Sequence, residues 1–201
     1  MSSRSKKGRP IDKWAAKQYF AISAPEFIVG EKQIGETVAD ESEKLIGRIL
    51  EAPLSEITGD YSRQHVNLQF QIEKVVGEEA KTVFKGHYYS RDYLRFLVRR
   101  RRTRIDAIIT VNTQDNIPIR VTATGFTTRR AKTSHKDGIR KAMIRTINEL
   151  AAQTPFEEFV QSATLGKMGS DVYNACKAIY PLKRVEIQKT KVLRSITPTV
   201  A

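Results

Sequence analysis

The segment HVNLQFQIEKVV, residues 65–76, alternates between apolar and polar side chains over most of its length. Val66, Leu68, Phe70 and Ile72 share one parity, and asparagine, glutamine and glutamate fill the positions between and after them. Because successive side chains of a β-strand point to opposite faces of a sheet, this period of two predicts a strand that is buried on one face and solvated on the other. We therefore expect a β-sheet with one apolar face turned toward a core.

Strand-like segments continue on both sides of this stretch. GEE, residues 77–79, predicts a turn into a hairpin partner, and TQDN, residues 113–116, joins two later strands through the turn formers Asp and Asn. The segments with strand character are FIVGEKQIGETVA (27–39), AKTVFKGHYY (80–89), RIDAIITVN (104–112), IPIRVTATGFTTR (117–129) and LKRVEIQKTKVL (182–193). We expect the last of them to return to the sheet as its final strand.

Helical periodicity dominates much of the later chain. Ile139, Met143 and Ile147 recur every four residues and lead to Leu150, which predicts an amphipathic helix of roughly four turns over residues 134–154. The other predicted helices are SRDYLRFLV (90–98), PFEEFVQSA (155–163) and SDVYNACKAIY (170–180), and the segment DKWAAKQYF (12–20) is expected to start with a short helix at Asp12.

These elements predict the α+β class, because the strands are concentrated before the long helix. Most strands follow one another through short turns, so we expect a mostly antiparallel sheet of about seven strands, closed or nearly closed into a β-barrel and flanked by three or four helices; closure leaves no exposed strand edge. We expect a flexible basic arm over residues 1–10, a single RNA-binding domain over residues 11–194, and a loose tail over residues 195–201.

Composition limits the functional class. The chain has 201 residues, 40% of them hydrophobic, with a formal net charge of +13 and a pI near 9.9. Its single cysteine, Cys176, excludes an intrachain disulfide and is typical of a reducing compartment. No run approaches the roughly 18 consecutive apolar residues of a membrane-spanning helix. Such a charge favours a polyanionic partner, nucleic acid before an anionic membrane surface.

The positive charge is segregated along the chain. Residues 91–104 hold seven arginines and one acid, a net charge of +6, and residues 129–145 have the same net charge. Residues 183–194 carry +4, whereas residues 26–60, with nine acids and three bases, carry −6. Every base in the first segment is arginine, whose planar guanidinium pairs with phosphate oxygens through two hydrogen bonds. These segments predict a surface that recognises the shape and backbone of folded RNA.

Aromatic residues accompany the arginines. Tyr88, Tyr89, Tyr93 and Phe96 lie next to the most basic segment. Two interpretations stay open for them, stacking on unpaired bases and packing in the core. No helix-turn-helix, zinc-finger or aromatic RNA-binding motif accompanies them, so the sequence does not favour base-specific reading of DNA.

The titratable residues are not grouped as in an active site. The three histidines, His65, His87 and His135, fall on different predicted elements, and their spacing does not suit a metal. GEKQIGET, residues 30–37, is similar to a phosphate-binding loop, but Glu36 occupies the lysine position and would repel phosphate. We therefore expect no enzyme, no catalytic residue, no cofactor and no metal site.

Two longer segments resemble a known family. KGHYYSRDYLRFLVRRRRTRID (85–106) and VTATGFTTRRAKTSHKDGIRKAM (121–143) are similar to the S-three-A-e family of archaeal and eukaryotic small-subunit ribosomal proteins, also called eukaryotic-type S-one. IDKWAAKQYFAISAP (11–25), IGETVA (34–39) and GRILEAPLSEITGD (47–60) resemble its N-terminal half. The arginine run after a short helix is the most specific part of the resemblance, which is closer to the archaeal form and spans residues 5–194.

The resemblance implies a structural constituent of the small ribosomal subunit that supports translation in the cytoplasm. It implies a β-barrel core on the platform, near the mRNA exit, with small-subunit rRNA, neighbouring platform proteins and mRNA as partners, and no membrane. It implies rRNA contacts for Arg99, Arg100, Arg101, Arg102, Arg104 and the loop 129–136. With the charged segments, the full set of expected RNA contacts is Arg4, Lys6, Lys7, Arg9, Arg91, Arg95, Arg99, Arg100, Arg101, Arg102, Arg104, Arg129, Arg130, Lys132, Lys136, Arg140, Lys183 and Arg184.

Two alternatives stay open. The first is an RNA-processing enzyme, which requires two carboxylates, or a histidine and a carboxylate, within hydrogen-bond reach in a cleft; His65, His87 and Asp106 are its candidate residues. The second is an RNA-binding protein outside the ribosome. We expect Asp106, Asp115 and Asp137 to be charge partners of neighbouring bases and not metal ligands.

Overall fold

The computed structural model describes residue 14, residues 17–30 and residues 32–193. The predicted basic arm, residues 1–10, lies outside the described residues together with its four expected RNA contacts, Arg4, Lys6, Lys7 and Arg9. The predicted tail, residues 195–201, lies outside them too. The arm, the tail and the extent of the domain therefore stay predictions.

Eight strands of the described chain form one sheet. Their bounds are β1 (Gln18–Ser23), β2 (Gln33–Ala39), β3 (Ile49–Pro53), β4 (Val66–Val76), β5 (Glu79–Tyr89), β6 (Arg104–Asn112), β7 (Pro118–Thr127) and β8 (Leu182–Val192). All neighbouring strands pair antiparallel except β1 and β5, which are parallel. The predicted α+β class with a mostly antiparallel sheet is confirmed.

The predicted closure into a β-barrel is not confirmed, because the sheet is open and branched. Its path runs β2-β1-β5-β8-β7-β6, and β4 with β3 joins β5 from the other side. Along its second edge, β5 pairs with β1 at residues 79–81 and with β8 at residues 86–88. The barrel prediction assumed that consecutive strands are neighbours, whereas β8, the last strand, lies between β5 and β7.

The described residues form six α-helices, more than the three or four expected. They are α1 (Glu26–Val29), α2 (Leu54–Thr58), α3 (Arg91–Leu97), α4 (Thr133–Gln153), α5 (Phe156–Thr164) and α6 (Lys167–Cys176), with two 3-10 helices, η1 (Ser42–Leu45) and η2 (Tyr61–Arg63). The prediction missed α1 and α2, which have only four and five residues and are too short for a periodic pattern. The short helix expected to start at Asp12 falls largely outside the described residues, and the segment continues into β1 from Gln18.

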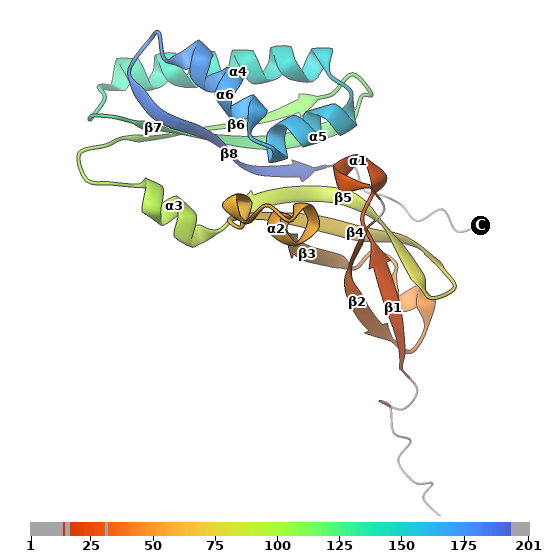
Figure 1. Ribbon diagram of the computed structural model, residues 1–201. Helices are drawn as coiled ribbons and strands as arrows, with labels where there is room; N and C mark the ends of the chain where they lie inside the picture. The colour runs from red at the N-terminus through yellow and green to blue at the C-terminus, as the bar shows by residue number, and fades with distance from the viewer. Residues whose placement is uncertain (1–13, 15–16, 31, 194–201) are drawn as a thin grey trace, which may run out of the picture.

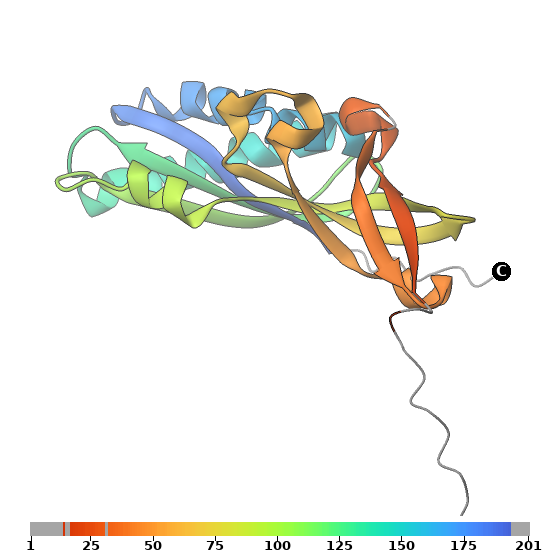
Figure 2. The ribbon, with the colours of Figure 1, turned by 60° about the horizontal axis from the view of Figure 1, so that its bottom comes forward.

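Two lobes divide the sheet. The C-terminal lobe consists of β6, β7 and β8, with α4, α5 and α6 together on one face (Figure 1). The N-terminal lobe consists of β1–β5 with α1, α2 and α3, and the β1–β2 hairpin stands at the end opposite α3 (Figure 2). No helix in the part of the chain that the structure describes is long and apolar enough to cross a membrane.

Burial follows the periodicities seen in the sequence. In β4, Val66, Leu68, Phe70 and Ile72 are at most 1% exposed and pack in the N-terminal lobe. In α4, Ile139, Met143 and Ile147 are fully buried against β6, β7 and β8. Each buried side chain of this size stabilises the fold by about 2 kcal/mol. The buried faces of the sheet and of α4 therefore form the stable core to which the arginine-rich segments are attached.

The lobes join through a short pairing of β5 with β8, over Gly86–Tyr88 and Lys189–Lys191. A Cβ on Gly86 would lie 2.4 Å from the carbonyl oxygen of Thr190, so only glycine permits this approach. His87 follows and is fully buried, with Nε2 3.0 Å from the Ile187 carbonyl oxygen and Nδ1 2.7 Å from Thr190 Oγ1. Because a carbonyl only accepts, Nε2 carries the ring proton and the Thr190 hydroxyl donates to Nδ1.

A second close approach, between Gly169 and the backbone of β8, leads to a prediction about the stability of two glycine-to-alanine variants. A Cβ on Gly169 of α6 would lie 2.9 Å from the Val185 carbonyl oxygen, whereas one on Gly138 of α4 meets only the Ile179 side chain, at 3.4 Å. We expect Gly169→Ala to destabilise the fold by about 1–2 kcal/mol through overpacking. Gly138→Ala should stabilise it by about 0.5–1 kcal/mol through helix propensity. Urea unfolding midpoints test this, and a Gly169→Ala chain as stable as Gly138→Ala would contradict it.

Candidate nucleic-acid interface

The two arginine-rich segments meet at one end of the C-terminal lobe. In the β6–β7 pair Arg104 lies opposite Phe126, so the residues before β6 adjoin those after β7. The Thr103 N–H donates to Thr127 Oγ1 at 2.9 Å, and the Thr127 N–H donates to the Thr103 carbonyl at 3.0 Å. The Ala131 N–H donates to Thr103 Oγ1 at 3.1 Å. These bonds fix the loop 98–103 against the loop 128–132.

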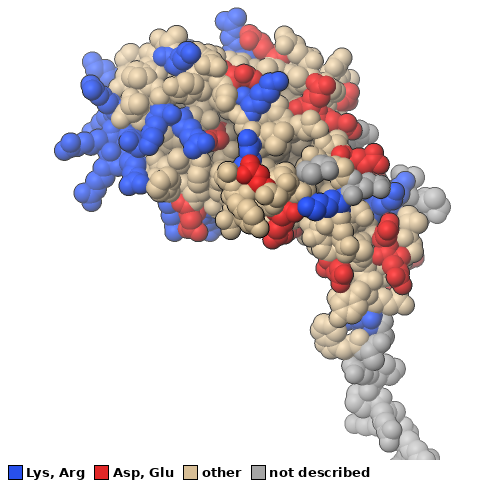
Figure 3. All heavy atoms as spheres, viewed as in Figure 1, with Lys and Arg blue, Asp and Glu red and all other residues tan. Residues whose placement is uncertain are grey.

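Six residues of these loops form what we call the arginine cluster: Arg99, Arg100, Arg101, Arg102, Arg129 and Arg130. Four of them line one surface hollow, together with Thr103, Arg104 and Thr128. Lys and Arg gather at this end of the molecule in Figure 3, whereas Asp and Glu of the same face lie mostly away from it, over both lobes. The segregation of charge along the sequence is therefore also a segregation in space.

The positive charges of the arginine cluster are not neutralised by acidic side chains of the described chain. Within the described chain, none of its six guanidinium groups forms an ion pair with a carboxylate. Arg99 donates from Nε to the Phe96 carbonyl at 3.2 Å and lies 4.9 Å from the Phe96 ring centroid, and Phe96 is 63% exposed. Arg101 has a φ of 62°, in the left-handed region that arginine rarely adopts. Concentrated like charges raise the free energy of the free protein, and a bound polyanion lowers it.

Three other expected contacts flank the cluster. Arg91, Arg95 and Arg104 line a hollow with Leu94 and Val98 beside α3. Arg95 is exposed and lies 3.8 Å from Asp92, a distance at which water competes effectively. Arg91 and Arg95 therefore extend the cationic surface along α3.

Three of the expected contacts are held by acids within the protein. Arg104 pairs with Asp106 at 2.8 Å and donates to Gln188 at 2.9 Å. Arg140 pairs with Asp137 at 3.0 Å, and Arg184 pairs with the buried carboxylate of Glu186. The prediction of charge partners is confirmed for Asp106 and Asp137. It is wrong for Asp115, which accepts from the Phe156 N–H at 2.7 Å and forms no ion pair in the described chain. These three guanidinium groups are positioned by the fold and have less free charge to offer RNA.

The remaining expected contacts lie on the same lobe. Lys132 ends the loop 128–132 as the N-cap residue of α4, Lys136 lies in the first turn of α4, and Lys183 lies at the start of β8. That start is fixed to the cluster, because the Thr128 N–H donates to the Pro181 carbonyl at 3.2 Å and the Tyr180 hydroxyl donates to the Arg130 carbonyl at 3.2 Å. The described members of the expected set thus share one region.

The histidines do not form an active site. His87 is buried in the lobe junction, His65 stacks on Tyr93 with ring centroids 3.7 Å apart, and His135 lies against Tyr180 at 5.1 Å. Burial lowers the pKa of His87 to about 4 and lowers the pKa of His65, with Arg184 and Arg63 contributing to the second shift. Among the described residues, no group of three or more His, Cys, Asp and Glu side chains could hold a metal ion.

The sequence patterns missed Arg63 and Lys167, which line a cleft between the lobes together with Lys183 and Arg184. Each stands outside the basic runs, and no motif surrounds it. Only the folded structure, which brings these two residues to the same surface, identifies them as candidates for binding.

Fold and surface together define a small α+β protein with one strongly cationic end. The sequence profile described as "Ribosomal S3Ae family" matches residues 5–195. Three proteins named "Small ribosomal subunit protein eS1" are similar to this chain. That of Methanothermobacter thermautotrophicus is 40% identical over 95% of this chain and 97% of its own length. That of Sulfurisphaera tokodaii is 42% identical over 92% and 95%, and that of Archaeoglobus fulgidus 40% over 96% and 92%. The chain therefore belongs to the Ribosomal S3Ae family.

Proposed function

We propose that this protein is a structural constituent of the small ribosomal subunit and that its arginine cluster binds the phosphates of small-subunit rRNA. The proposal rests on family membership for the ribosomal role and on one observation for the contact. That observation is the set of six arginines from two distant segments, brought to one end of the sheet without ion pairs in the described chain. Guanidinium groups in that state bind phosphate oxygens directly.

The finer placement follows the same proposal. The protein lies on the platform, near the mRNA exit, and works in the cytoplasm as part of the ribosome. The arginine cluster, α3 and the start of α4 face rRNA, whereas the acidic stretch 26–60 faces basic neighbouring ribosomal proteins. Exposed apolar side chains on the N-terminal lobe, Tyr19 and Ile49 among them, suit a protein neighbour. Contact with mRNA near the exit is part of the proposal.

No observation among the described residues favours the enzyme alternative. The family consists of ribosomal components, and the protein is not an enzyme. The two histidines named for that alternative are occupied in packing and hydrogen bonding. Asp106 is bound by Arg104 and by Thr124, whose hydroxyl donates to Asp106 Oδ1 at 2.8 Å. We therefore assign no catalytic role to these side chains.

Salt dependence of rRNA binding tests the proposal. If the arginine cluster neutralises six phosphates, the logarithm of the association constant should fall with the logarithm of salt concentration with a slope of about −4 to −5. Fluorescence anisotropy of a labelled small-subunit rRNA fragment, measured with the full chain over a salt series, gives the slope. A slope near zero, or absence of the protein from purified small subunits, would overturn the proposal.

A further inference from the structure

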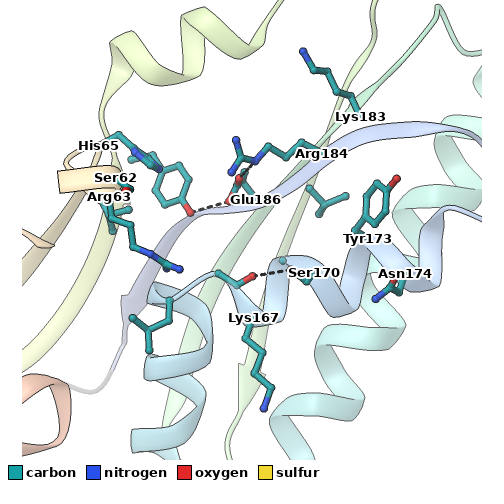
Figure 4. Close-up of a pocket in the computed structure, with 16 residues that line it drawn as sticks. Ser62, Arg63, His65, Lys167, Ser170, Tyr173, Asn174, Lys183, Arg184 and Glu186 are labelled. Carbon is teal, nitrogen blue, oxygen red and sulfur yellow. Dashed lines mark hydrogen bonds and ion pairs between the residues drawn. The ribbon is translucent and has the colours of Figure 1, made fainter. Parts of the chain in front are cut away.

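A cleft of about 600 Å³ lies where the two lobes meet. Its walls come from η2 and the start of β4, from the start of β8, and from the first part of α6 (Figure 4). These three segments are far apart in the sequence. The open sheet brings them together, because β8 inserts between β5 and β7 and α6 packs on β8 through Gly169.

The cleft is cationic. Arg63, Lys167, Lys183 and Arg184 line it, and Glu186 is the single carboxylate in its lining. Glu186 is 7% exposed, and it is engaged by Arg184 and by the Tyr89 hydroxyl, which donates at 2.9 Å. The carboxylate is therefore already neutralised. The charges of Arg184 and Arg63 also help lower the pKa of His65, as expected for a locally positive potential.

One corner of the cleft is suited to a phosphate. Arg63 donates from Nη1 to the Thr164 carbonyl at 3.3 Å, and this nitrogen lies 3.7 Å from where a Cβ on Gly166 would be. Gly166, with a φ of 77°, precedes α6 and gives the helix no side-chain cap. The N–H groups of the first turn therefore have no acceptor within the helix. A guanidinium group beside the N-terminus of a ten-residue helix is an anion-binding arrangement.

The opposite wall is aromatic. His65 and Tyr89 line the cleft with their rings in edge contact, 5.0 Å between centroids. His65 is held from behind by its stack on Tyr93. Apolar lining from Val66, Leu165 and Val185 adds to this wall. Rigid aromatic and apolar surfaces of this kind take up unpaired bases in RNA-binding proteins.

The cleft continues from the arginine cluster. Lys183 and Arg184 follow Leu182, which lies opposite Thr127 in the β7–β8 pair. The loop that carries Arg129 and Arg130 begins directly after Thr127. An RNA strand bound at the arginine cluster can therefore pass along the start of β8 into the cleft.

We propose that this cleft binds one unpaired nucleotide of RNA, with its phosphate between Arg63 and the first turn of α6 and its base against His65 and Tyr89. The inference rests on the proposed function, because the arginine cluster supplies most of the affinity and the cleft selects the form of RNA. It assigns binding roles to Arg63 and His65, which the basic runs of the sequence do not single out. For Tyr89 it favours base stacking, one of the two interpretations that the sequence left open. It makes the protein a reader of a bulged or extruded base.

The test compares two RNA hairpins that differ by one unpaired adenosine in the stem. Wild-type full chain should bind the bulged hairpin about tenfold more tightly, the effect of stacking one base. Arg63→Gln removes the guanidinium group, and Ser170→Tyr fills the cleft from an exposed position of α6. Both variants should bind the two hairpins with nearly equal affinity. With 2-aminopurine at the bulge, wild type should quench the fluorescence and both variants should not.

Two control variants make the same kinds of substitution at positions outside the cleft. Lys141→Gln removes an exposed cation of α4, and Ala175→Tyr places an aromatic ring at an exposed position of α6 outside the lining. Both should keep the preference for the bulged hairpin. Equal binding of both hairpins by wild type, or a preference that survives Arg63→Gln and Ser170→Tyr, would overturn the inference while leaving the proposed function intact. Failure of the proposed function would differ, since neither hairpin would then show salt-dependent binding.

Discussion

A chain with glutamine in place of Arg99, Arg100, Arg129 and Arg130 is expected to bind small-subunit rRNA about a thousandfold more weakly. These four guanidinium groups form no ion pair in the described chain, so each has its full charge available for a phosphate. Each lost contact should cost about 1 kcal/mol at an ionic strength near ~0.1 M, and four together amount to roughly three powers of ten. Anisotropy titrations with a labelled rRNA fragment measure this loss.

The same variant should change the salt dependence as well as the affinity. Its log–log slope should be about three smaller in magnitude than that of wild type, because about four fewer counterions are released. The matched control replaces four exposed lysines elsewhere with glutamine and so has the same net charge: Lys44, Lys74, Lys141 and Lys177. If the control loses as much affinity as the arginine variant, total charge and not the arginine cluster governs binding, and the proposal fails.

The division between free and internally paired arginines was not predictable from the sequence. Arg102 and Arg104 are two residues apart in one basic run, yet Arg104 alone is held by Asp106 and Gln188. The pairing depends on strand geometry, since Arg104 and Asp106 share the face of β6 turned away from the helices and β8 brings Gln188 to them. A basic run therefore predicts a cationic region, and the fold decides which of its members are available to a ligand.

Local periodicity predicted the individual elements well. The alternation in residues 65–76 gave β4, and the four-residue spacing from Ile139 gave α4 within one residue of both predicted ends. These patterns record only which face of an element is buried. Strand order depends on contacts between distant segments, so the insertion of β8 between β5 and β7 and the branch at β5 left no local pattern, and the barrel prediction failed there.

The sequence predicted the candidate site in part, as it predicted the fold in part. Charge segregation correctly indicated a cationic surface, because clustered arginines on two loops need only be brought to the same end of a hairpin. The sequence did not predict the cleft, because Arg63, Lys167 and Arg184 come from three different elements. Of the three, only Arg184 lies in a basic segment. Sites of this second kind become visible only with the fold.

Acidification is expected to destabilise the protein through His87, and His87→Gln should remove that part of the loss. Burial lowers the pKa of His87 to about 4 in the folded chain, against 6.5 in the unfolded chain. Between these values the unfolded state binds the proton and the folded state does not, so stability is complete above pH 6.5 and falls as pH decreases toward 4. The slope is about 1.4 kcal/mol per pH unit, and the total is about 3 kcal/mol.

Urea unfolding of wild type and His87→Gln from pH 7.5 to about 4.5 isolates this contribution, because other titrating groups cancel in the difference. The lowered pKa of His65 acts in the same direction and is common to both chains. Glutamine can donate to the Ile187 carbonyl as the ring does, so the variant should fold, with lower stability at neutral pH and a smaller loss on acidification. His135→Gln, the same change outside the junction, is the matched control. A His87→Gln chain that loses stability as steeply as wild type would show that the β5–β8 junction does not exclude the proton.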